Sequence, residues 1–321
     1  MASITLDKYD LRLLYELDKN SSQPISTLAN KIKRSKQFVF YRLQNLEQEK
    51  IITGYHAIID MSKLGYFTFR IYLKLQKMTL EDHNKLVEYI KYNFKQVWTI
   101  TSMHGKWDLA IFLGVEHVVD FHNFWDELLK VYKENIHRYN VAVYAPIINF
   151  NRKFFLKMNE EPIERIYGAG TPEKIDEVDR KIVEAYGPNV RNKYTELSTV
   201  LKVSPDIVRR RIKSLEERKI IVGYKLGLNL EKLGYVGYRV DLQLNSTKIN
   251  KELLEYCKMH TYIYQINKSI GGADFEIEVI VRDLQHLLEV IDELKKKFKD
   301  VINDAEWFGF STFHILKYIP D

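Results

Sequence analysis

Basic and amide side chains cluster on two short segments, where they could contact double-stranded DNA. In the segment 205–218, Arg209, Arg210 and Lys213 fall on positions that the apolar residues of a helix leave free. Arginine can hold guanine with two hydrogen bonds or clamp a phosphate. In the segment 36–48 the same positions carry glutamine and tyrosine, which can read adenine and reach a phosphate. The predicted DNA-contacting residues are Lys36, Gln37, Tyr41, Arg42, Gln44, Arg209, Arg210, Arg211 and Lys213.

Some of these side chains also allow a structural interpretation. Arg42 and Arg211 occupy matching positions, and salt bridges to Asp10 and Asp179 would tie each helix to the first helix of its segment. Phe40 is an unusual residue for a DNA groove unless it meets a thymine methyl group, so packing against another domain is the alternative. The two segments are therefore not equivalent, and if one of them has lost DNA binding, we expect it to be the first.

The sequence contains no arrangement typical of a catalytic or metal site. His117 and His122 lie five residues apart on a predicted helix, so they point to different faces, unlike the pair of a helical zinc site. Neither a phosphate-binding glycine-rich loop nor a nucleophile elbow is found. Cys257 is the single cysteine, which excludes an intrachain disulfide framework and fits a reducing cytoplasm. The sequence thus predicts no enzyme, no cofactor and no metal.

The chain contains an internal repeat. Residues 7–66 align with residues 176–235 at a constant shift of 169 without a gap. The run Lys50–Tyr55 meets Lys219–Tyr224, and the later Gly105–Asp108 corresponds to Gly271–Asp274 at a shift of 166. Agreement over several separate blocks predicts a duplicated unit.

Each repeat opens with three predicted helices. The first shows apolar residues on one helix face, and the second is short. Ser35 can cap the third helix of the first repeat, and Ser204 followed by Pro205 is the stronger start signal in the second. Three helices with a turn before the last are typical of a helix-turn-helix domain.

The remainder of each repeat predicts strands and helices in the order βαββαβ. In the first repeat strands are expected near 67–76, 97–104, 107–115 and 138–150, and helices near 80–94 and 117–135. The second repeat has strands near 236–244, 262–269, 274–282 and 304–317, and helices near 248–259 and 284–299. This ferredoxin-like order places both helices on one face of a sheet, so the other face needs a partner.

These elements predict an α+β fold with four domains. The boundaries are 1–60 and 175–229 for the helix-turn-helix domains, 61–156 and 230–321 for the βαββαβ domains, and 157–174 for a linker with prolines, glycines and mixed charge. The 321 residues are enough for that number of domains.

Net charge supports the helical segments as the nucleic-acid face. The chain has 49 Lys and Arg against 43 Asp and Glu, a net charge of +6. Residues 1–66 carry +3 and residues 171–235 carry +4, so the rest of the chain carries about −1. Phosphate neutralisation requires such a placement. No uncharged apolar run reaches the roughly 18 residues of a membrane span, and no signal peptide is found, so no membrane partner is expected.

Several blocks in order resemble the Lrp/AsnC (feast/famine) transcription regulators. They are Leu6-Asp7-x-x-Asp10, Ser35-x-x-x-Val39-x-x-Arg42-Leu43-x-x-Leu46-Glu47, Ile52-x-Gly54-Tyr55 and Leu64-Gly65. The βαββαβ portion resembles the effector-binding RAM domain of that family. The resemblance implies DNA binding through the helix-turn-helix, pairing through RAM sheets, and sensing of amino acids at the RAM interface.

The family's ligand region includes a Gly-x-x-Asp turn between the two central strands, and two segments match it. The resemblance implies that the candidate effector-binding residues are Gly105, Trp107, Asp108, Gly271, Gly272 and Asp274. Backbone N–H groups there could hold an effector carboxylate, and the aspartate its ammonium group. The alternative is that each glycine makes a tight hairpin that its aspartate caps.

The sequence-based prediction is a cytoplasmic DNA-binding transcription regulator with an amino acid or other small effector. Its two RAM-like domains pair either within one chain, as a pseudo-dimer, or between two chains. Siroheme decarboxylases also resemble Lrp/AsnC proteins and combine two related subunits, so a fused decarboxylase is the enzymatic alternative. His104 is the only trace of the motif expected for it. A ligand-sensing or scaffold protein that uses its helical domains for protein contacts is the third possibility.

Overall fold

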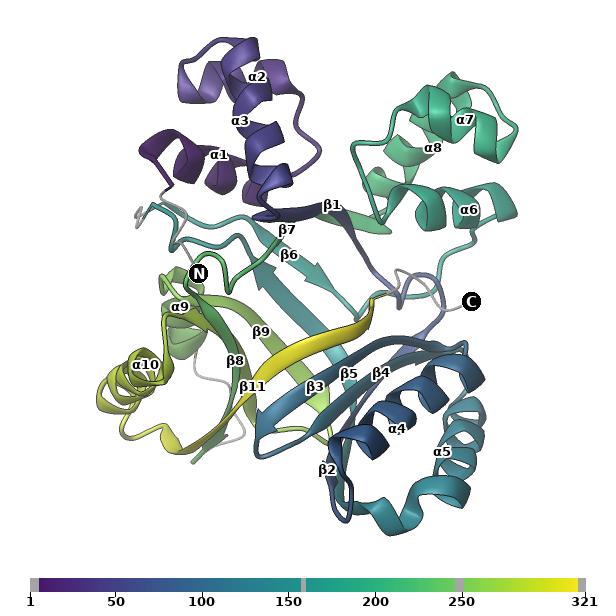
Figure 1. Cartoon of the computed structure of the whole chain (residues 1–321), viewed down its shortest axis with the longest axis vertical. Helices are drawn as coiled ribbons and strands as arrows, with labels where there is room; N and C mark the ends of the chain where they lie inside the picture. The colour runs from purple at the N-terminus through teal and green to yellow at the C-terminus, as the bar shows by residue number, and fades with distance from the viewer. Residues whose placement is uncertain (1–5, 157–159, 246–250, 317–321) are drawn as a thin grey trace.

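Two helical domains stand side by side on a larger β structure that has helices on its outside (Figure 1). The computed structural model describes residues 6–156, 160–245 and 251–316. The first helical domain consists of α1 (Lys8–Lys19), α2 (Ile25–Ile32) and α3 (Lys36–Gln48). The second consists of α6 (Glu177–Tyr186), α7 (Tyr194–Leu201) and α8 (Pro205–Glu217). None of the helices in the described part of the chain is both long and apolar enough to cross a bilayer.

Side-chain caps fix where the third helices begin. The Ser35 hydroxyl accepts a hydrogen bond from the Phe38 N–H, and the Ser204 hydroxyl accepts one from the Ile207 N–H. Each cap satisfies a backbone donor that the first turn leaves unpaired, which stabilises a helix by about 1 kcal/mol. Both predicted start signals are confirmed.

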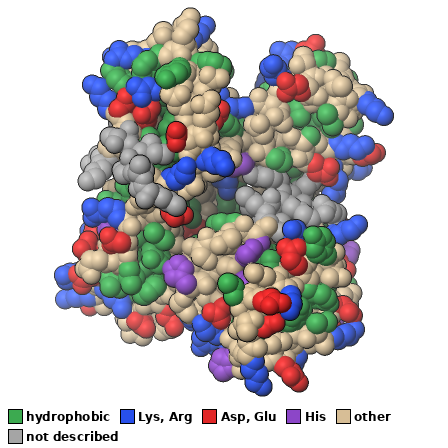
Figure 2. Space-filling model, viewed as in Figure 1, with side chains coloured by type: hydrophobic (Ala, Val, Ile, Leu, Met, Phe, Trp, Pro, Cys, Tyr) green, Lys and Arg blue, Asp and Glu red, His purple; other side chains and the backbone are tan. Residues whose placement is uncertain are grey.

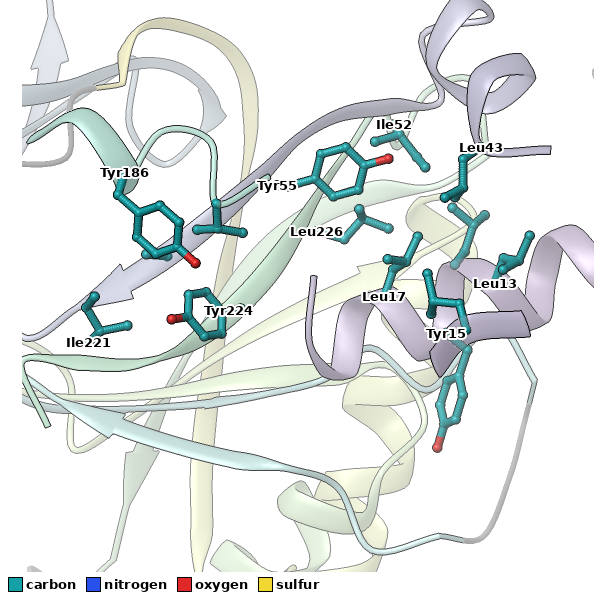
Figure 3. Packing of buried hydrophobic residues seen from close by; sticks show 14 of the residues in the cluster. Leu13, Tyr15, Leu17, Leu43, Ile52, Tyr55, Tyr186, Ile221, Tyr224 and Leu226 are labelled. Carbon is teal, nitrogen blue, oxygen red and sulfur yellow. The ribbon is translucent and has the colours of Figure 1, made fainter. Parts of the chain in front are cut away.

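A two-stranded antiparallel ribbon joins the helical domains. Strand β1 (Ile52–Ile59) pairs with β7 (Ile221–Leu228), and the sequence did not predict this pairing. Tyr55 and Leu226 lie in its buried surface, where they pack with side chains of α1 and α3 (Figure 3). Each such fully buried side chain stabilises the domain by about 1.5–3 kcal/mol. The ribbon thereby makes one hydrophobic core out of two helical domains.

The remaining strands close into an eight-stranded antiparallel barrel. Around the ring the order is β2 (Phe67–Leu75), β4 (Leu109–Val115), β3 (Val97–Gly105), β11 (Ile302–Leu316), β8 (Val236–Leu244), β10 (Phe275–Val281), β9 (Ile263–Ile270) and β5 (Ile136–Phe150). Strand β5 pairs back to β2, which closes the ring and leaves none of these eight strands with a free edge.

Strands β5 and β11 hold the two halves of the barrel together. Strand β5 pairs with β2 through its first half and with β9 through its second half. Strand β11 pairs with β8 and then with β3 in the same way. The RAM-like domains therefore pair within one chain, with their unpartnered sheet faces turned into the barrel interior.

Four helices cover the outside of the barrel. Helices α4 (Leu80–Asn93) and α5 (Val118–Tyr132) pack on the first half, with a short 3-10 helix at Lys133–Asn135. Helices α9 (Lys251–Met259) and α10 (Leu284–Lys297) pack on the second half. The predicted order of strands and helices in both halves is confirmed.

The predicted linker over 157–174 contains a short strand in its described part. Strand β6 (Glu164–Tyr167) pairs with the end of β5. Arg165 is 3% exposed, and it donates to the Asn149 side chain at 3.0 Å and to the Asp18 carbonyl at 2.6 Å. The prolines and mixed charge of this segment did not indicate a strand, because the strand is short and depends on contacts with distant residues. Residues 157–159 lie outside the described residues.

Candidate active site inside the barrel

The predicted DNA-contacting side chains separate into two groups. Those that lie exposed on α3 and α8 are Lys36, Gln37, Tyr41, Gln44, Arg209, Arg210 and Lys213. Acidic neighbours take up part of the charge on α8, since Arg209 pairs with Asp206 at 3.0 Å and Lys213 with Glu217 at 3.5 Å. Figure 2 shows Lys and Arg interspersed with Asp and Glu on both helical domains. Contact between this first group and DNA stays a prediction.

Arg42 and Arg211 form the second group, and their assignment to DNA is corrected. Arg42 lies 2.7 Å from Asp7 and 3.1 Å from Asp10. Arg211 repeats this pairing with Asp176 at 2.8 Å and Asp179 at 3.2 Å. Each arginine therefore ties the third helix of its domain to the first helix, as the alternative interpretation predicted.

The two glycine turns form tight hairpins, and the aspartate that ends each turn bonds to a neighbouring strand instead of capping the hairpin. Gly105 has φ +100° and Gly271 has φ +86°, a conformation that side-chain-bearing residues rarely adopt. Asp108 accepts from the Leu75 N–H and from the Lys74 ammonium, both at 2.8 Å. Asp274 accepts from the Leu244 N–H at 2.9 Å. Assigning Asp108 to an effector is thus corrected, because its carboxylate already holds the neighbouring strand.

A cavity of about 350 Å³ lies where the two turns meet at one end of the barrel. Of the predicted effector residues, Trp107, Gly272 and Asp274 line it, whereas Gly105, Asp108 and Gly271 do not. The lining residues that the sequence analysis missed are Tyr72, Lys106, Asn140, Asp241, Gln243, Ala273 and Glu306. They come from strands far apart in the chain and meet only because the barrel closes.

Corresponding positions of the two halves face each other across this cavity. Tyr72 on β2 corresponds to Asp241 on β8 at the shift of 169. Asn140 corresponds to Glu306 at the shift of 166, since β5 begins at 136 and β11 at 302. The cavity therefore lies on the pseudo-twofold axis of the barrel, and the residues on its two sides differ.

A buried ionic network lies deeper in the barrel. Arg70 is 1% exposed and Glu276 is fully buried, and two guanidinium nitrogens lie 3.0 and 3.1 Å from the two carboxylate oxygens. Arg239 contacts the same carboxylate and also Asp241 at 2.8 Å. Burial alone would raise the pKa of Glu276, but the two arginines together bring it below its usual value. The network is therefore charged at neutral pH.

Tyr72 lies between this network and the cavity. Its side chain is 1% exposed, and the hydroxyl has no hydrogen-bond partner among the residues that the structure describes. The Arg70 guanidinium lies 4.5 Å from the ring centroid, and the Phe308 ring packs edge-on at 5.1 Å. Burial raises the pKa of Tyr72 well above its usual value, so its phenol stays protonated.

Cations gather around Trp107 on one side of the cavity. The Lys106 ammonium lies 5.6 Å and the Arg138 guanidinium 5.0 Å from the Trp107 ring centroid. The cavity is also lined by carboxylates, of which Asp241 pairs with Arg239 and Glu306 with Lys106. A ligand carboxylate near Trp107 would therefore meet the exposed Arg138, and it would compete with Glu306 for Lys106.

His104 does not contribute to the cavity. It lies exposed near the end of β3, with its ring 5.8 Å from that of Tyr238. The single histidine that the sequence analysis connected with decarboxylases is thus outside this site.

Comparisons with known proteins identify the family. A model of winged helix-turn-helix DNA-binding domains matches residues 6–53. The transcriptional regulator LrpA of Pyrococcus horikoshii is 33% identical over 119 residues, which are 36% of this chain and 83% of LrpA. The chain belongs to the Lrp/AsnC family. The regulatory protein AsnC of Escherichia coli is 30% identical over 38% of this chain and 85% of its own length, so these relatives correspond to one half of the chain.

A solved structure with the same fold spans nearly the whole chain. The siroheme decarboxylase NirDL is similar over 98% of this chain and 94% of its own, with a TM-score of 0.64 and 12% identity. Its complex with an iron-uroporphyrin III analogue is similar with a TM-score of 0.62 and 11% identity over the same shares. This Lrp/AsnC chain therefore shares its complete architecture, including the second half, with a decarboxylase.

This finding contradicts two of the sequence-based predictions. The chain was expected to be a DNA-binding transcription regulator and not an enzyme, and the near-full-length likeness to NirDL favours the enzymatic alternative instead. The basic helices of the repeat suggested DNA, but those helices are a property of the family. This chain differs from the single-unit regulators in that it carries both halves of the barrel.

Proposed function

We propose that this chain is an enzyme that decarboxylates an iron tetrapyrrole of the siroheme class. One observation carries the proposal: the cavity is built by both halves of a fold that NirDL shares over 98% of the chain. We also infer that the chain arose by duplication of one Lrp/AsnC unit, because residues 7–66 and 176–235 align without a gap. Pairing within the chain then gives one complete site per molecule.

Two cations near Trp107 are the groups that could meet an anionic substrate. Siroheme carries acetate and propionate side chains around its ring. Arg138 beside Trp107 can bind such a carboxylate, and Lys106 can do so by exchanging its ion pair with Glu306 for one with the substrate. A tetrapyrrole is larger than the cavity of about 350 Å³, so the cavity holds one edge of the ring with the reacting side chain.

The reaction needs neither an oxidant nor a reductant. The carboxylate leaves as carbon dioxide and a proton takes its place, which turns an acetate side chain into a methyl group. Trp107 and Tyr72, 4% and 1% exposed, provide a wall from which water is largely excluded. A carboxylate that moves from water to this wall loses its hydration. The loss favours breakage of the bond to the methylene carbon, because the product, carbon dioxide, is neutral.

Anaerobic incubation of the purified chain with siroheme tests the proposal. Mass spectrometry should show products that have lost carbon dioxide. Lys106→Ala should weaken siroheme binding by about tenfold, the loss expected for one charge-assisted hydrogen bond. The double variant Arg209→Ala/Arg210→Ala is the matched control, since it removes exposed cations from α8 and should decarboxylate at the unsubstituted rate. Absence of both siroheme binding and carbon dioxide loss would refute the proposal.

A further inference from the structure

We propose that Tyr72 is the catalytic residue that delivers the proton which replaces the departing carboxylate. The inference rests on the proposed function, because it assigns a role within that reaction. Tyr72 is the buried side chain of the cavity wall whose hydroxyl lacks a partner among the described residues. An orphaned hydroxyl at that place costs stability in the free protein, so its retention points to a partner that arrives with the substrate.

The three carboxylates of the wall already have partners. Asp241 accepts from Arg239 at 2.8 Å, and Asp274 accepts from the Leu244 N–H at 2.9 Å. Glu306 is held by the Lys106 ammonium. These carboxylates are acceptors in ion pairs or hydrogen bonds, whereas the Tyr72 phenol is a donor.

The proton transfer balances without any further reactant. The bond between the methylene carbon and the carboxyl carbon breaks, and its electron pair stays on the methylene carbon and is shared with the adjoining pyrrole ring. Carbon dioxide leaves, and the methylene carbon takes the proton of the Tyr72 hydroxyl. The resulting phenolate then takes a proton from solvent through the cavity mouth.

Buried cations support the phenolate while it exists. The Arg70 guanidinium lies 4.5 Å from the Tyr72 ring centroid, and both Arg70 and Arg239 act electrostatically to lower the pKa of Tyr72 against the larger effect of burial. Their charges are fixed before the reaction, so no reorganisation is needed when the phenolate forms.

Of the two positions related by the pseudo-twofold axis, one carries such a proton donor. The position that corresponds to Tyr72 in the second half is Asp241, which is engaged by Arg239. A substrate that loses two carboxylates must therefore present each of them in turn to the same phenol, and a singly decarboxylated product should be released between the two events.

The variant Tyr72→Phe tests the assignment, with Tyr144→Phe as its matched control. Both phenols pack beside the Arg70 guanidinium, at 4.5 and 5.2 Å, but Tyr144 does not line the cavity. Each variant is titrated with iron-uroporphyrin III by visible absorbance and assayed with siroheme. Tyr72→Phe should bind within about threefold of the unsubstituted chain while its turnover falls by about 100-fold or more, the contribution of general acid catalysis. Tyr144→Phe should keep the binding affinity and the turnover rate of the unsubstituted chain.

A second measurement does not depend on how Tyr72→Phe folds. Replacement of Tyr72 by 3-fluorotyrosine keeps the shape and makes the phenol more acidic, so the solvent deuterium isotope effect on turnover should change. A Tyr72→Phe variant with the unsubstituted turnover would overturn the role of Tyr72 and leave the proposed function standing. Three other results would also overturn the role of Tyr72 and leave the proposed function standing. They are equal losses of turnover in Tyr72→Phe and Tyr144→Phe, a loss of binding in place of turnover in Tyr72→Phe, and an isotope effect that fluorination leaves unchanged. No turnover by the unsubstituted chain would overturn both proposals.

Discussion

Arg70 and Glu276 form a bidentate ion pair across the two halves of the barrel, although 206 residues separate them in the chain. Both side chains are almost completely buried, and each half supplies one of them. A buried ion pair contributes little more to folding stability than well-packed apolar residues would. Removing one member, however, leaves an uncompensated buried charge.

Arg70→Met should therefore destabilise the chain strongly. We expect the free energy of unfolding to fall by about 3 kcal/mol, since Glu276 keeps only Arg239 as a neutralising partner. Urea unfolding followed by circular dichroism measures the change. Lys85→Ala removes an exposed pair with Glu81 and should change stability by less than about 0.5 kcal/mol. A loss in Arg70→Met no larger than in this control would contradict the structural role.

The pH dependence of stability should reflect Glu276. Its pKa in the folded chain lies below the usual value of 4.5, so the unfolded chain binds the proton more readily. The resulting stabilisation is present above the unfolded pKa and is lost as the pH falls through the folded pKa. Urea midpoints between about pH 6 and pH 3 should fall less steeply for Glu276→Gln than for the unsubstituted chain. Parallel curves would argue against a charged Glu276.

Lys153 should produce a dependence of the same sign at alkaline pH, with stability again rising as the pH increases. It is 2% exposed, its ammonium donates to the Lys258 carbonyl, and burial lowers its pKa from 10.5 to about 8. Between these two values the unfolded chain binds more protons, so stability should rise as the pH increases through that window. Lys153→Met should abolish this rise and be more stable near pH 7, because no buried charge remains. Thermal unfolding across the window compares the two proteins.

Arg42→Ala should destabilise its helical domain more than Arg211→Ala does. Arg42→Ala removes the arginine partner of the nearly buried Asp10, whereas Arg211→Ala leaves Asp179 paired with Arg218 at 3.4 Å. Arg42 is 28% exposed, so we expect a loss of about 2 kcal/mol for Arg42→Ala, less than for a fully buried pair, and a smaller loss for Arg211→Ala. Lys36→Ala, at an exposed position of α3, is the control. Unchanged stability would return both arginines to the candidate ligand-binding residues.

Local patterns in the sequence were sufficient for the elements and for contacts over short distances. Apolar periodicity predicted the helices and the barrel strands of both halves but not β1, β6 and β7. The pairing of Arg42 with Asp10 was predicted because the same two residue types recur, at the same separation of 32 residues, in Arg211 and Asp179. Such contacts lie within one domain, so spacing along the chain decides them.

The site could not be predicted in the same way, because it depends on how distant strands meet. Tyr72 looks like an ordinary aromatic strand residue until β2 and β8 face each other across the closed barrel. One signal was present: Arg70 and Arg239 stand at corresponding positions, each between two apolar neighbours in its strand. A charged residue at a buried position of a strand needs a partner, and its recurrence indicated the interior of a shared barrel.

The covalent connection between the halves also determines which halves pair with each other. Because β5 and β11 each pair with strands of both halves, two separate subunits of this design could combine in three ways. Two of them would be homodimers, one with two phenols and one with two aspartates at the axis. In a single chain each Tyr72 is synthesised together with its own Asp241, so every folded molecule has the mixed pair and none is lost to the wrong partner.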